Sequence, residues 1–118
     1  MNSKEAIQSY LFAERAKTNL ITASQMTSVL YELKGAEKSG AKKMLKLFIG
    51  AIGQDLGMAH KVTGKQEFLE ASGILEQAES MIDNEDFDDA QLAVGRAITK
   101  ATTPAQQAWQ VLSENEFV

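Results

Sequence analysis

Few residues in this chain have side chains that could do chemistry. Cysteine is absent, and His60 is the only histidine among 118 residues. Thiol catalysis, disulfide frameworks, Cys-based zinc sites and multi-histidine metal centres are therefore excluded. The Glu-x-x-His pairs that bind iron in ferritin-like bundles are also absent. We expect His60 to lie in the last turn of a helix, where a partly cationic imidazole suits the helix dipole.

An acidic cluster offers the next candidate chemistry, because carboxylates could bind calcium or magnesium. Its members are Asp83, Glu85, Asp86, Asp88 and Asp89. The order of an EF-hand loop is missing, since no glycine stands at its sixth position and no glutamate at its twelfth. A helix start explains the cluster instead, with Asp86 as the N-cap and the last two aspartates in the first turn. We therefore predict no metal site, no cofactor and no catalytic residue.

Charge is divided unevenly along the chain. Residues 1–65 carry a net charge of +5 and residues 66–118 a net charge of −9, within an overall −4. One interpretation is that the two halves attract each other inside the monomer. The other is that a basic patch faces a polyanion or an acidic protein. The lysines of this patch are Lys34, Lys38, Lys42, Lys43 and Lys46.

Three glycines share one face of the second expected helix. Gly50, Gly53 and Gly57 follow an i, i+3, i+7 spacing. Each costs about 1 kcal/mol of helix propensity relative to alanine. Such a stripe indicates close approach of another helix, which is either a neighbour within the bundle or the helix of a partner. Both interpretations stay open at this point, and we take the three glycines as candidate partner-binding residues.

Apolar periodicity predicts the elements that position these residues. The spacing of three and four predicts one helix from Ser3, as N-cap, to about Lys34. A turn over residues 34–40 follows, with Ser39 as the cap of a second helix that runs from about Gly40 to Lys61.

Two further helices complete the pattern. Thr63-Gly64-Lys65-Gln66 has the form of a capping box that opens the third helix, and Asp83–Asp86 is the next break. The fourth helix carries an alanine-rich apolar series that continues across Thr103-Pro104. Because that dipeptide is itself a helix-start signal, we expect a kink or a short break near residues 101–103.

These elements predict an all-α fold. Residues 1–118 are expected to form a single domain, an antiparallel up-and-down four-helix bundle with its last helix kinked or broken near Pro104. Small residues at core positions of the second and fourth helices indicate closely spaced helices. Trp109 lies slightly off the apolar series and is expected to cover the edge of the core.

A short segment resembles a known family. Leu33-Lys34-Gly35-Ala36, followed by Gly40-Ala41, resembles the signature of histidine-phosphotransfer domains, which are also four-helix bundles of about this size. The phosphoaccepting histidine of that family stands two positions before the Leu-Lys-Gly. Tyr31 occupies that position here. The resemblance therefore implies a bundle that binds a protein without phosphorelay chemistry.

Two functions remain. The first is a non-enzymatic protein-interaction or regulatory module, either a small subunit of a larger assembly or a homodimer. The alternative is a small nucleic-acid-binding subunit that uses the Lys34–Lys46 patch, with an affinity that falls steeply with salt. The most apolar stretch, Met44–Gly53, is too short to span a bilayer, so we expect no membrane partner and a cytoplasmic location.

Overall fold

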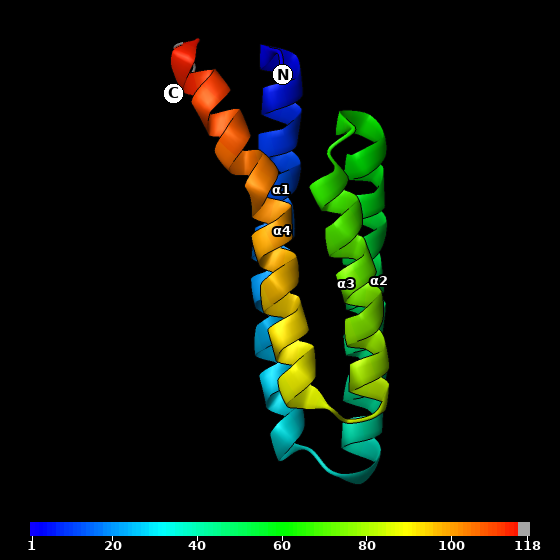
Figure 1. Ribbon diagram of the computed structural model, residues 1–118. Coiled ribbons are helices and arrows are strands. Elements are labelled where there is room, and N and C mark those ends of the chain that lie inside the picture. Colours follow the sequence, from blue (N-terminus) through cyan, green and yellow to red (C-terminus); the bar gives the residue numbers. More distant parts are fainter. Residues whose placement is uncertain (116–118) are drawn as a thin grey trace.

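The structure is a computed structural model that describes residues 1–115. Its helices are α1 (Ser3–Val29), α2 (Gly35–Thr63), α3 (Gln66–Asp83) and α4 (Phe87–Glu114), and a short 3-10 turn, η1 (Leu30–Glu32), follows α1. Each helix packs beside the next in the chain, and α4 closes the ring against α1 (Figure 1). The predicted all-α, antiparallel up-and-down four-helix bundle is therefore confirmed.

The core is built from one stripe of each helix, and the two helix pairs contribute different side chains. Helices α2 and α3 bury large residues, whereas α1 and α4 bury mainly alanine. Small side chains let the axes of α1 and α4 approach closely, as the alanine series of the fourth helix predicted. The large residues are Leu45, Ile49, Ile52, Leu56, Phe68, Leu75 and Ile82. The alanines include Ala13, Ala16, Ala23, Ala90, Ala97 and Ala101.

The starts of α1 and α2 differ from the sequence prediction. The side chain of Asn2, rather than that of Ser3, caps α1 by accepting a hydrogen bond of 2.8 Å from the Glu5 amide. Helix α2 begins at Gly35 instead of Gly40, so most of the predicted turn is helical. Gly35 makes the sharp entry with a φ of +59°, and Ser39 lies inside the helix.

The caps between α2, α3 and α4 also differ in detail. Gly64 ends α2 in the left-handed region, with its amide donating to the His60 carbonyl at 2.7 Å. The predicted capping box is wrong, because the cap position of α3 is Lys65 and it makes no side-chain cap bond. Asp86 is the cap residue of α4 as expected, although its side chain does not bond the helix amides.

Pro104 lies inside a continuous α4, so the kink occurs without a break. Figure 1 shows the C-terminal part of the helix leaning away from the bundle axis. Proline removes one helical N–H and clashes with the preceding turn, which is the usual cause of such a bend. Just before it, the hydroxyls of Thr102 and Thr103 donate to the carbonyls of Ile98 and Thr99, at 2.9 and 3.0 Å.

The bundle is elongated, with extents of 54 × 23 × 18 Å. The chain ends of α1 and α4 lie together beyond the α2–α3 turn (Figure 1), where Ala6, Ala108 and Leu112 form a small separate core. Trp109 is half exposed there and packs on Tyr10 with ring centroids 6.4 Å apart, at the edge of the core as expected. Among the described residues, no helix combines the length and apolar character that crossing a membrane requires.

Candidate functional site on the outer face of α2

Most of the predicted basic patch is occupied within the chain. Lys38 forms an ion pair with Glu85, and Lys46 forms one with Asp83 at 2.8 Å. Lys42 lies between them, 3.2 Å from the Asp83 carbonyl and 3.8 Å from the Glu85 carboxylate. The hydrogen bond from Lys38 holds the pKa of Glu85 below its usual value. These three lysines pair α2 with the α3–α4 turn. Such pairs are what we expect if the two oppositely charged halves of the chain attract each other inside the monomer.

The other two lysines of the patch face solvent. Lys34 and Lys43 are exposed and have no ion-pair partner within residues 1–115. Lys34 stands at the N-cap of α2, and Lys43 lies on the outer part of the helix one turn before Leu47. Of the five lysines, only Lys34 and Lys43 are therefore free of an ion pair within residues 1–115.

The acidic cluster is also partly engaged in joining the ends of helices. Asp88 accepts a hydrogen bond from the Tyr31 hydroxyl, which raises the pKa of Tyr31. The Tyr31 ring packs edge-on against Phe87 at 5.6 Å between centroids. Within residues 1–115, no three acidic or histidine side chains are grouped closely enough to hold a metal ion.

The predicted glycine stripe divides between two environments. A Cβ on Gly50 would lie 3.2 Å from the Glu79 carboxylate, and one on Gly53 would lie 3.7 Å from the Ser72 hydroxyl. Ser72 also donates a hydrogen bond of 3.3 Å to the Gly53 carbonyl. These two glycines follow the seam between α2 and α3, whereas a Cβ on Gly57 would meet nothing within 4 Å.

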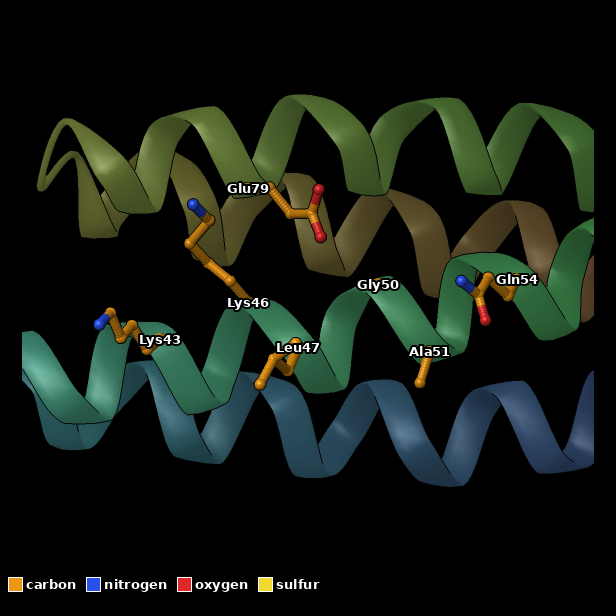
Figure 2. A pocket seen from close by; sticks show the side chains of 7 residues that line it. All are labelled: Lys43, Lys46, Leu47, Gly50, Ala51, Gln54 and Glu79. Carbon is orange, nitrogen blue, oxygen red and sulfur yellow. The ribbon is translucent and has the colours of Figure 1, made fainter.

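Gly50 also opens a hollow on the surface. This hollow has a volume of about 660 Å³, and it is lined by Lys43, Lys46, Leu47, Gly50, Ala51, Gln54 and Glu79. Figure 2 shows that Glu79 reaches it from α3, whereas the other six residues belong to α2. The structure therefore brings together three of the predicted partner-binding residues, Lys43, Lys46 and Gly50, at one place.

Beside the hollow, α2 carries a second apolar face that the sequence analysis missed. We call it the outer stripe, and its residues are Met44, Leu47, Ala51, Met58 and Val62. They follow an i, i+3, i+7, i+14, i+18 pattern, which places them on one side of a helix. All five are exposed, with Leu47 71% and Met44 64% accessible. The signal was present in the sequence, but the buried series around Leu45 and Ile49 already explained an amphipathic helix.

The two flanks of the outer stripe carry different charges. Toward α1, Asp55 is held by Arg15 at 2.6 Å, and the Arg15 guanidinium also lies over the Phe12 ring. Toward α3, Lys43 and Lys61 are exposed near the two ends of the stripe without an ion-pair partner in the described part of the chain. The stripe is therefore an apolar strip with unpaired positive charge near each end.

Comparison with known proteins assigns no family and no function to the chain. No protein-family model, curated protein or solved structure matches the chain.

Proposed function

We propose that this protein is a non-enzymatic interaction module of the cytoplasm that binds another protein through the outer stripe and the hollow beside it. The observation that carries the proposal is a second row of apolar side chains on α2, which is exposed and distinct from the buried face of the helix. Core packing explains only one apolar face of a bundle helix. The stripe has two apolar parts, residues 44–51 and 58–62, which Gln54 and Asp55 separate. An exposed apolar surface with a polar rim is typical of a protein-binding site.

The side chains of the stripe suit this role. Met44 and Met58 are unbranched and polarizable, so they can adapt to the shape of a partner. Leu47 and Ala51 line the hollow, which gives a partner side chain a place to insert. Binding energy at interfaces concentrates on such pockets and the residues that fill them.

Nucleic-acid binding through the Lys34–Lys46 patch is the alternative. The exposed positions of Lys34 and Lys43 favour it. The ion pairs of Lys38 and Lys46 with the α3–α4 turn weaken it, because those charges would have to leave their partners to bind phosphate. Protein binding is therefore the better-supported function.

Photo-crosslinking at two matched positions tests the proposal. A photoreactive phenylalanine analogue replaces Leu47 in one full-length variant and Leu92 in another, and each is expressed in the protein's own host. The two side chains are 71% and 68% accessible, and Leu92 lies on α4, which is diagonal to α2 in the ring. We expect a discrete protein adduct from position 47 and none from position 92.

The outcome separates the candidate functions. Adducts from both positions, or from neither, would contradict docking on the outer stripe. For nucleic acid, a labelled oligonucleotide is titrated against the chain and against a variant with Lys38, Lys42 and Lys43 replaced by glutamate. Salt-sensitive binding that this variant loses and Leu47→Gln retains would assign the alternative function.

A further inference from the structure

We infer that the occupant of the outer stripe is an amphipathic α-helix of another protein, with carboxylates near its two ends and an uncharged middle. This inference rests on the proposed function and specifies the chemistry of the partner. The stripe runs from Met44 to Val62 along one straight helix, a distance of about 27 Å at 1.5 Å per residue. Its three- and four-residue steps are the spacing at which two helices pack side by side.

The hollow fixes where the partner approaches most closely. Gly50 supplies no side chain, so a hollow remains between Leu47 and the Glu79 carboxylate, which lies 3.2 Å from the place of a Gly50 Cβ. A partner helix lying along the stripe would place one large apolar side chain over Gly50. Leu47 and Ala51 lie on the side of Gly50 away from Glu79 (Figure 2), where they would give that side chain apolar contacts.

The charges next to the stripe indicate which charge the two ends of the partner helix carry. Lys43 and Lys61 are separated by most of the length of the stripe, and both are exposed without an ion pair in the part of the chain that is described. Lys46, between them, is held by Asp83. A carboxylate near each end of the partner helix would form ion pairs with Lys43 and Lys61. These pairs would set the register of the partner helix along the stripe.

The middle of the stripe has the opposite preference. Glu76 and Glu79 both line the α2–α3 seam beside Gly53, whereas Lys43 and Lys46 line the hollow toward the N-terminal end of the stripe. A partner carboxylate at this level would face two like charges. The partner is therefore uncharged where it passes Gly53.

A second copy of this chain fits the stripe less well. Antiparallel pairing of two α2 helices about the middle of the stripe brings Lys43 of one copy within about a turn of Lys61 of the other. This arrangement opposes like charges, which disfavours the association of two copies.

The test uses designed peptides and the full-length protein. The probe is a helical peptide of about 21 residues with a leucine stripe, glutamate near each end and glutamine in the middle. The first control has lysine in place of the terminal glutamates, and the second has the glutamates moved to the middle. Each is titrated into isotope-labelled protein while the amide NMR signals of Leu47, Ala51, Met58 and Leu92 are followed.

We expect the end-glutamate peptide to shift the three stripe signals and leave Leu92 unchanged. Its Kd at low salt should be at least about tenfold lower than that of either control peptide, because rim charges steer association and select partners. The double variant Lys43→Glu/Lys61→Glu should reverse the order of the end-glutamate and end-lysine peptides. Leu47→Gln should weaken binding of all three.

Failure of this inference is distinguishable from failure of the proposed function. Equal affinities, or tighter binding of either control, would overturn the proposal of an acidic-ended partner helix. Shifts that still centred on the outer stripe would leave the proposed docking face standing. If no peptide bound but position 47 still gave a protein adduct, the proposal of a partner helix would fail and the proposed function would stand. A homodimer that Leu47→Gln dissociates would assign the stripe to a second copy. Neither shifts nor adduct would remove both proposals.

Discussion

The two faces of α2 carry similar residues in opposite environments. On the inner face, Leu45, Ile49 and Leu56 are almost completely buried among the other helices. On the outer face, Met44, Leu47 and Met58 are each more than half accessible. Folding explains the first set, because burial of apolar surface stabilises the bundle. It does not explain the second set, and that difference is the basis for assigning the outer face to binding.

The lysines of α2 divide in the same way. Those that face the α3–α4 turn are engaged by Asp83 and Glu85 and hold the end of the bundle together. Lys43 and Lys61 have no such partner in the described residues and lie beside the outer stripe. Some charged and apolar residues of α2 therefore stabilise the bundle. Others, beside and within the outer stripe, remain available to a partner.

The largest expected difference between the faces comes from truncating one residue on each. Leu56→Ala removes a buried side chain and should lower the free energy of unfolding by about 2–5 kcal/mol. Met58→Ala removes an exposed one and should change it by no more than about 0.5 kcal/mol. Urea unfolding at constant m-value measures both. If both variants lost a similar amount of unfolding free energy, the outer face of α2 would contribute to folding as the inner face does.

Gly57 in α2 and Gly64, which directly follows α2, provide a smaller test with opposite signs. Gly57→Ala adds a Cβ where there is open space, so it should raise the free energy of unfolding by about 1 kcal/mol. Gly64→Ala places an L-residue at a φ of +71° and should lower that free energy by about 1 kcal/mol. Thermal unfolding distinguishes the two. Destabilisation by Gly57→Ala would mean that the whole glycine stripe packs internally.

The smallest effect concerns the lysines that fasten the turn. The pKa of Glu85 is lowered in the folded state, chiefly by the hydrogen bond from Lys38. Its stabilising contribution is therefore complete above the ordinary glutamate pKa and disappears as the pH falls through the lowered value.

The stability difference between the wild type and Glu85→Gln should be present at neutral pH and close between about pH 5 and pH 3. Salt should reduce it, because the pair is exposed. Lys43→Gln is the matched control and should show no such pH-dependent difference. A difference that grows at low pH would contradict the ion-pair assignment.

Periodicity was enough to predict the fold, because each helix buries one regular stripe. Start positions were less predictable. Gly35 and Gly40 are both plausible breaks in the sequence, and α2 begins at Gly35, which has a left-handed conformation. Pro104 carried two opposite signals, and packing of α4 on the core kept the helix continuous through it.

The candidate site was only partly predictable. Gly50, Lys43 and Lys46 were identified from the sequence, and the structure gathers them around one hollow. The pairing of Lys46 with Asp83 joins residues 37 positions apart and depends on the register of the bundle, which local spacing does not specify. The spacing of Leu47 and Met58 was visible in the sequence, but only the folded chain shows that these two side chains are exposed.

The central claim is that the outer stripe serves binding and contributes little to folding. The most direct test replaces four of its side chains together, as Met44→Gln/Leu47→Gln/Met58→Gln/Val62→Thr, with the photoreactive residue at Ala51. We predict that the unfolding free energy stays within about 1 kcal/mol of that of the single Ala51 variant, whereas the protein adduct is lost. A loss of several kcal/mol, or an undiminished adduct, would contradict the claim.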